Sequence, residues 1–200
     1  ILFVASRFAM HMEMPLQEVK GFINGVDVGK LEATIDAVNN NPDLAAFRFH
    51  IANEWINGTK TETAAQRIDG GPQVLIRTEP FKIRSDQPCV LMGADTAPCA
   101  AVSLMHALAS CLSTSIVYAA SLRGIEIKKM SIILEGDVDI QGVLGISEQI
   151  KPGLTNLDLD IRIDSNSPKQ EIEEIVQYAQ KHSMILDTLI NQMNLDINLV

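Results

Sequence analysis

The spacing of apolar residues in the first part of the chain predicts one helix followed by antiparallel strands. Apolar side chains recur at helical spacing after Asp27, a good N-cap, until the polar run 39–42 ends the helix. Residues 47–52 then alternate between apolar and polar, which is typical of a strand. Asn57-Gly58 predicts a two-residue hairpin turn with positive φ at both positions, and a return strand over residues 62–68.

A second turn and a third strand precede the longest apolar segment of the chain. Residues 69–72 predict the turn, and residues 73–84 predict a strand that is interrupted at Pro80. No charged residue then occurs over residues 98–122, and Arg123-Gly124 is a typical helix end. The sequence therefore predicts one long helix over residues 99–122.

This helix raises the question of a membrane span. It is expected to be capped by Asp95 or Thr96, and at about 36 Å it would be long enough to cross a bilayer. Serines, a threonine and His106 dilute its apolar character, and no basic flank precedes it. We therefore expect the central buried helix of a globular domain, with His106 as a core histidine and no contact with a membrane.

The last third of the chain predicts two more strands and two more helices. Residues 131–140 and 157–164 alternate as half-buried antiparallel strands do. Ser167-Pro168-Lys169-Gln170 predicts a capping box that opens a helix, and residues 184–191 predict a second helix. Residues 195–200 are expected to form a final strand. Strands, a long helix, strands and helices in this order predict an α+β fold with antiparallel sheets.

Length and charge narrow the class of protein. Two hundred residues with 46% hydrophobic content fit one domain, over residues 23–200, behind an N-terminal extension of upstream or vector origin over residues 1–22. The formal net charge is −9 and the pI is near 4.8, which argues against nucleic acid and anionic membranes as partners.

The three cysteines of the chain are Cys89, Cys99 and Cys111. Their odd number and unpaired spacing fit neither a disulfide framework nor a zinc site. We therefore expect a reducing, cytoplasmic setting. Cys111 lies near the middle of the apolar helix, where a thiol is most often a small core residue.

Three candidate metal or acidic sites are set aside. Residues 137–148 follow the spacing of a calcium-binding EF-hand loop almost throughout, but that loop lies between two helices, and residues 131–140 alternate as a strand. The acidic residues over 158–164 fit the solvent face of an amphipathic strand. The four histidines show no metal-binding pair. No metal and no cofactor are expected.

The long helix carries a stripe of small residues beside Cys111. Ser103, Ala107, Ser110 and Thr114 follow one another at intervals of three or four residues. Small side chains allow another backbone to approach closely, and the chain has few aromatic residues to cover such a face. A partner subunit is a reasonable source of the missing cover.

Several motifs in order give the chain, from about residue 24 to its end, a resemblance to the OsmC/Ohr superfamily of osmotically induced and organic hydroperoxide resistance proteins. The motifs are Trp55-Ile-Asn-Gly-Thr59, Ser85-Asp86-Gln87-Pro88, Leu91-Met-Gly-Ala-Asp95, His106-Ala-Leu-Ala-Ser-Cys111-Leu, Tyr118-Ala-Ala, Arg123-Gly-Ile-Glu-Ile127, Glu135 to Gly145, and His182-Ser-Met-Ile-Leu-Asp187.

The resemblance implies an intertwined α+β homodimer with antiparallel sheets around a long central helix and active sites at the subunit interface. It also implies thiol-dependent peroxide reduction. In that chemistry a peroxidatic cysteine becomes a sulfenic acid, and a second cysteine captures it as a disulfide. An arginine stabilises the thiolate, and a glutamate orients the arginine.

The chain matches one of these four groups. Cys111 stands at the peroxidatic position, whereas Ser183 replaces the second cysteine. The family arginine position falls on Glu62, and the family glutamate position falls on Ala101 or Val102. Arg67 or Arg77 remains open as a substitute for the arginine.

Two functions from different classes follow. One is a thiol-dependent reductase of organic hydroperoxides in oxidative stress defence, weakened to one cysteine and dependent on an external thiol. The other is a non-catalytic homodimer that binds an apolar small molecule at the subunit interface. Apolar surroundings without a cation disfavour the reactive thiolate, so we expect Cys111 to be slow. Cys99 lies about 18 Å from it along the helix and is too far to resolve a sulfenic acid.

Overall fold

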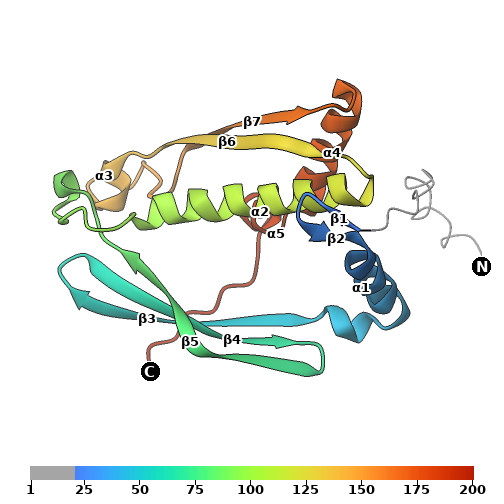
Figure 1. Cartoon of the computed structure of the whole chain (residues 1–200). Helices are drawn as coiled ribbons and strands as arrows, with labels where there is room; N and C mark the ends of the chain where they lie inside the picture. The colour runs from blue at the N-terminus through green and yellow to red at the C-terminus, as the bar shows by residue number, and fades with distance from the viewer. Residues whose placement is uncertain (1–20) are drawn as a thin grey trace, which may run out of the picture.

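Two antiparallel sheets lie on opposite sides of one long helix (Figure 1). This is a computed structural model, which describes residues 21–200, and it confirms the predicted α+β class with a central helix. The elements in chain order are β1 (Phe22–Ile23), β2 (Val26–Asp27), α1 (Val28–Asn40), η1 (Pro42–Ala45), β3 (Phe47–Asn57), β4 (Lys60–Gly70), β5 (Gln73–Ser85), η2 (Cys89–Leu91), α2 (Ala100–Leu122), β6 (Ile127–Asp137), α3 (Ile140–Val143), β7 (Asn156–Ser165), α4 (Lys169–His182) and α5 (Met184–Ile190).

The three-stranded sheet β3-β4-β5 begins with the predicted hairpin, but the turn lies one residue later. Asn57 pairs with Lys60 as the last residues of the two strands, so the turn residues are Gly58 and Thr59. Only Gly58 has a positive φ, of 53°, and glycine first is the pattern of a type II′ turn. The expectation of positive φ at Asn57 was therefore wrong.

The predicted break at Pro80 appears as an irregularity within β5, which the structure continues from Gln73 to Ser85. Arg67 pairs with Ile76 and Ala65 pairs with Phe81, so β5 has extra residues opposite Gln66. A proline has no N–H for the ladder, which explains why the pairing is lost around this position.

The helix α2 ends as predicted but begins later. Gly124 has a φ of 70°, and the N–H of Ile125 donates to the carbonyl of Ala120, which closes the helix end. The N-cap is Cys99, without a side-chain hydrogen bond. The expected caps were wrong because both residues belong to the preceding loop: Asp95 has a φ of 52°, and the hydroxyl of Thr96 donates to the carboxylate of Asp86.

The strands β6 and β7 confirm the predicted alternation, with Ile132 opposite Ile161 on the inner face. β6 ends at Asp137, however, and Val138 and Ile140 do not continue it. The Asp139 side chain accepts a hydrogen bond from the N–H of Gln141 and starts the short helix α3 instead. A local cap thus overrides the apolar alternation at this point.

The helix α4 buries Ile175 and Ala179 toward α2, as its apolar spacing predicts. The predicted capping box is absent: Pro168 is the N-cap and makes no side-chain bond. Ser167 instead donates its N–H to the Ser165 hydroxyl. The final strand predicted over residues 195–200 was also wrong, because that segment is exposed and forms no ladder with another strand of the described chain.

The core of the described chain lies between α2, α4, β6 and β7. Its fully buried members come from three segments and are Ile116, Ala119, Ala120, Ile125, Ile175 and Ala179. By length and composition α2 is the one helix within residues 21–200 that could cross a membrane. One face of it packs on α4, β6 and α5, as expected of the core helix of a globular domain.

The β1–β2 hairpin is tied to this core by hydrogen bonds of Asn24 and Ser121. The Asn24 side chain donates to the carbonyl of Ile125 at 2.9 Å and accepts from the N–H of Ile127 at 2.8 Å. Ser121, at the end of α2, donates its hydroxyl to the carbonyl of Ile23. The predicted extension over residues 1–22 lies almost wholly outside the described residues.

Candidate functional site

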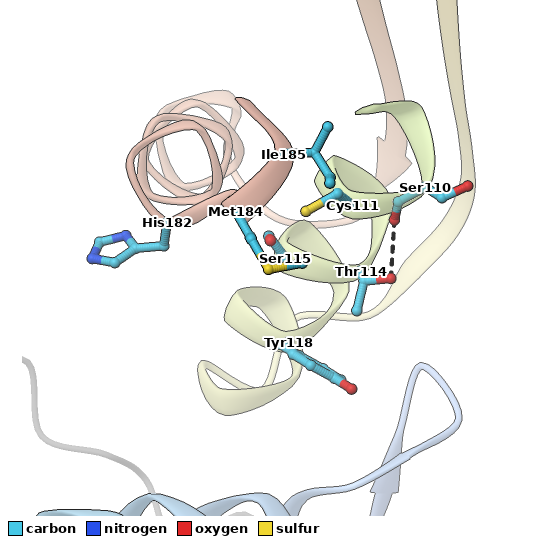
Figure 2. Close-up of a pocket in the computed structure, with 8 residues that line it drawn as sticks. All are labelled: Ser110, Cys111, Thr114, Ser115, Tyr118, His182, Met184 and Ile185. Carbon is cyan, nitrogen blue, oxygen red and sulfur yellow. Dashed lines mark hydrogen bonds between the residues drawn. The ribbon is translucent and has the colours of Figure 1, made fainter. Parts of the chain in front are cut away.

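Cys111 lies in the middle of α2 at the wall of an open pocket. Figure 2 shows its sulfur pointing toward Met184 and Ile185 at the start of α5. The thiol is half-buried, and the pocket has a volume of about 470 Å³. The lining residues come from α2 and the α4–α5 region and are Ser110, Cys111, Thr114, Ser115, Tyr118, His182, Met184 and Ile185.

Ser183 reaches Cys111 from the junction between α4 and α5. Its extended backbone (φ −82°, ψ 112°) separates the two helices, and its hydroxyl accepts from the N–H of Leu186 as the N-cap of α5. The same hydroxyl donates to the Cys111 sulfur at 3.2 Å, and Ser183 is 1% exposed. The structure therefore brings together Cys111 and Ser183, the two positions at which the resemblance implied a pair of cysteines.

His182, next to Ser183, is held away from the thiol. Its Nδ1 lies 2.7 Å from the carbonyl of Tyr178 and donates to it, and its ring stacks on the Tyr178 ring with centroids 4.0 Å apart. Figure 2 shows the His182 imidazole directed away from Cys111. His182 therefore borders the pocket without contacting the sulfur.

The remaining polar groups of the pocket are hydroxyls on α2. Thr114 donates to the carbonyl of Ser110 at 3.0 Å, one turn earlier (Figure 2). The Ser110 hydroxyl lies 3.5 Å from Nε2 of His106. His106 is exposed in the single chain, so the expectation of a core histidine was wrong. No lysine or arginine is among the eight lining residues. Within the described chain the pocket thus offers hydrogen bonds and apolar contacts but no fixed positive charge.

Glu62, which the resemblance implied to stand at the family arginine position, belongs to a separate ion-pair network. Its carboxylate accepts from Lys82 at 2.9 Å and from Arg84 at 3.0 Å. These hydrogen bonds hold the pKa of Glu62 below its usual value. Its strand, β4, lies in the three-stranded sheet, which is not among the elements that pack closely on α2 within residues 21–200.

The two alternative arginines lie in the same sheet but on different faces. Arg67 donates from Nε to Asp69 at 2.7 Å, and Asp69 also contacts His50, so Arg67 belongs to the charged face. The guanidinium of Arg77 instead lies 4.6 Å above the ring of Phe81, a residue of the apolar face. Arg77 is thus the arginine available on the apolar side.

The family glutamate position offers no polar group. Ala101 and Val102 lie in the first turn of α2, and Val102 is 51% exposed. Nine residues separate Val102 from Cys111, which is about 13.5 Å along the helix axis. The other cysteines lie in η2, where Cys89 is exposed, and at the start of α2, where Cys99 is half-buried.

Asp86, part of the motif over residues 85–88, is the centre of a buried hydrogen-bond network. It is 1% exposed, and its carboxylate accepts from the hydroxyls of Thr59 and Thr96 at 2.6 and 2.8 Å and from three backbone N–H groups. The Thr59 hydroxyl bond is the largest cause that holds the pKa of Asp86 far below its usual range. This network shapes the loop that leads from the sheet into α2.

Gly93 closes the same loop. A Cβ at this position would lie 1.7 Å from the carbonyl oxygen of Gln87, so only glycine fits. In the sequence, Asp86 and Gly93 were indicated only by their places in the motifs over residues 85–88 and 91–95. The hydrogen bonds themselves are long-range and cannot be seen in the sequence.

Within residues 21–200, no group of three histidine, cysteine, aspartate or glutamate side chains is placed to hold a metal ion. Residues 137–148, considered as a calcium loop, begin at the end of strand β6 and include the four-residue helix α3. The two long helices that flank an EF-hand loop are therefore not present around this segment.

Comparison with solved structures shows the same fold at low sequence identity. An OsmC-like protein from Mycoplasma pneumoniae is 17% identical, with a TM-score of 0.54, and the match covers 71% of this chain and 86% of that one. A candidate osmotic stress induced and detoxification response protein from Psychrobacter arcticus is 14% identical, with a TM-score of 0.51 and coverage of 69% and 85%. An OsmC-like protein of unknown function from Vibrio cholerae is 12% identical, with a TM-score of 0.50 and coverage of 72% and 95%.

No curated protein matches the chain. The family model described as OsmC-like protein matches residues 93–198, which include Cys111, Ser183 and all residues that line the pocket. This match spans more than half of the chain, and it agrees with the sequence motifs and with the fold. The chain therefore belongs to the OsmC-like protein family.

Proposed function

We propose that this protein is a thiol-dependent reductase of organic hydroperoxides that acts through Cys111 alone. The observation that supports this most is the position of the thiol at the wall of an open pocket, with the Ser183 hydroxyl donating to its sulfur at 3.2 Å. A donated hydrogen bond favours the thiolate, which is the nucleophile. We place the protein in the reducing cytoplasm, in oxidative stress defence.

The proposed reaction balances with one cysteine and an external thiol. The Cys111 thiolate attacks an oxygen of the hydroperoxide, so that an S–O bond forms, the O–O bond breaks and the alkoxide takes a proton to leave as an alcohol. The sulfenic acid then reacts with an external thiol to give a mixed disulfide and water. A second thiol releases the disulfide and regenerates Cys111.

A second copy of the chain is part of this proposal. The three-stranded sheet has one charged face and one apolar face, and the apolar face is exposed in the single chain. Seven of its large side chains are each more than half exposed, and they are Phe47, Phe49, Ile51, Trp55, Leu75, Phe81 and Ile83. A face of this kind is the mark of an interface. We propose a homodimer in which this face is covered.

The homodimer would also supply a cation. Arg77 lies over Phe81 on the apolar face, so Arg77 of the second copy is the candidate to stabilise the Cys111 thiolate. Arg67 is engaged with Asp69 on the opposite face and is not expected to do so. This assignment chooses between the two arginines that the sequence left open.

A non-catalytic function is favoured by one observation, the absence of lysine and arginine from the pocket lining. In that case the homodimer binds an apolar small molecule, and Cys111 is a wall residue only. An uncharged dye that fluoresces in apolar pockets would bind under both proposals. Only turnover separates them.

The test is steady-state reduction of cumene hydroperoxide with dithiothreitol as the reductant. We expect slow turnover by the wild type, loss of turnover in Cys111→Ser, and unchanged turnover in Cys89→Ser, the matched control with an exposed thiol. Equal rates in the wild type and Cys111→Ser would reject the reductase and leave the binding function.

A further inference from the structure

The Cys111 sulfur is contacted by the hydroxyl of Ser183, which takes part in two hydrogen bonds at once. Ser183 accepts from the N–H of Leu186 at 3.3 Å and donates to Cys111 at 3.2 Å. A hydroxyl has one hydrogen, so the donation to sulfur fixes where that hydrogen lies. Ser183 is 1% exposed, and water does not compete for it.

The contact is also fixed by the backbone on both sides. Ser183 lies between the last residue of α4 and the first residue of α5, and both helices pack on α2. Its rotamer is held by the capping bond to Leu186. The oxygen therefore meets the sulfur as a preorganised donor rather than as a mobile surface group.

We infer that Ser183 is a positioning residue for Cys111: its hydroxyl orients the sulfur toward the pocket and stabilises the thiolate that reacts there. The inference rests on the proposed function only for the nature of the natural electrophile. The chemical effect on the thiol holds for any electrophile that enters the pocket.

The same geometry also predicts the effect of a cysteine introduced at position 183. An atom there lies within reach of the sulfur, so a thiol introduced at this position could close to bonding distance after a small rotation. Oxidation would then consume the Cys111 sulfenic acid internally: the introduced thiol displaces water from it and an S–S bond forms. Serine cannot carry out this step, so in the natural chain the sulfenic acid awaits an external thiol.

The experiment measures alkylation of Cys111 by iodoacetamide with peptide mass spectrometry, and the exposed Cys89 serves as an internal reference in the same sample. We expect Ser183→Ala to slow Cys111 alkylation about threefold to tenfold relative to Cys89, because one hydrogen bond to the thiolate is lost. Ser183→Thr keeps the hydroxyl and should restore most of the rate, which a packing effect would not do.

A control tests whether the loss of a helix N-cap elsewhere in the fold changes the reactivity of the thiol. Asp27→Ala removes the N-cap of α1 and should leave the Cys111 rate unchanged. An unchanged rate in folded Ser183→Ala, or failure of folded Ser183→Thr to restore the rate, would overturn the inference.

If Ser183→Ala does not fold, Ser183→Cys decides the matter. With one equivalent of cumene hydroperoxide the wild type should gain one oxygen at Cys111, whereas this variant should lose two hydrogens as a disulfide forms. Absence of the disulfide in the folded variant would overturn the inference. Altered alkylation without hydroperoxide turnover by the wild type would uphold it and reject the proposed function instead.

Discussion

The two sides of α2 differ in how they bury their apolar surface. On the side of β6, β7 and α4, the single chain completes a core in which Ile116 and Ile175 are nearly inaccessible. On the other side, the sheet β3-β4-β5 leaves Ile51 and Phe81 more than 60% exposed. In the first region, one chain is sufficient to bury the apolar side chains. The second region is the apolar surface that the homodimer we propose would cover.

The largest expected effect is on assembly, and it tests the exposed sheet face. In Ile51→Asp a charge would be buried without a partner in each copy, so we expect the dimer dissociation constant to rise about 1,000-fold or more. Light scattering across a concentration series measures this. Ile76→Asp is the matched control, because Ile76 is similarly exposed but pairs with Arg67 on the charged face. Equal dimer dissociation constants for the two variants would show that the apolar face is not the interface.

The next effect tests the core that the single chain completes. Ile175 is 1% exposed on α4, and Ile175→Ala should lower the free energy of unfolding by about 2–5 kcal/mol through lost burial and a cavity. Denaturant unfolding at fixed protein concentration measures the change. Ile197→Ala, at an 87% exposed position of the tail, should stay within about 0.5 kcal/mol of the wild type. Comparable losses in both variants would show that the tail is buried in the assembly.

A smaller effect concerns the loop between the two regions and depends on pH. The pKa of Asp86 is lowered by its hydrogen bonds, so its ionised form stabilises the fold above the unfolded pKa near 4, and this contribution is lost as the pH falls. Asp86→Asn should lower the midpoint of thermal unfolding by roughly 5 °C at pH 7, with a difference from the wild type that shrinks below about pH 4. A difference that is constant with pH, measured against the exposed control Asp158→Asn, would exclude this origin.

The smallest expected effect is on the rate of Cys111 oxidation, which would depend on a residue from the exposed sheet. If Arg77 from the apolar sheet face stabilises the thiolate of the other copy, Arg77→Ala should slow Cys111 oxidation by about tenfold. Arg67→Ala should leave the rate unchanged, because Arg67 pairs with Asp69 on the charged face. Stopped-flow oxidation with cumene hydroperoxide measures both. The reverse order of effects would assign the role to Arg67.

Sequence patterns predicted the elements well wherever one face of an element is buried within the chain. The alternation in β6 and β7 and the apolar face of α4 were visible because burial enforces their period. The caps were less predictable, because Thr96 donates to the buried Asp86 of the preceding loop instead of capping α2. Ser167 donates its N–H to the hydroxyl of Ser165, two residues earlier, instead of forming the capping box. The tail alternates like a strand, but alternation cannot supply a neighbouring strand.

The site was predictable in part for the same reason. Cys111 and Ser183 are 72 residues apart, and only the family motifs indicated that they would meet. The motif assigned Glu62 to the family arginine position, but its ion pairs with Lys82 and Arg84 follow from the strand ladder and could not be predicted from the motif. Which arginine faces the apolar side depends on the irregularity opposite Gln66, a feature of strand register that local spacing does not encode.

The most direct test of one-cysteine chemistry at Cys111 is the intact mass of the protein after one equivalent of cumene hydroperoxide, with dimedone as a trap for sulfenic acid. The account predicts one dimedone adduct at Cys111, none in Cys111→Ser, and overoxidation to sulfinic acid with excess hydroperoxide. Rapid formation of a disulfide between Cys111 and Cys89, or no modification of Cys111, would contradict it.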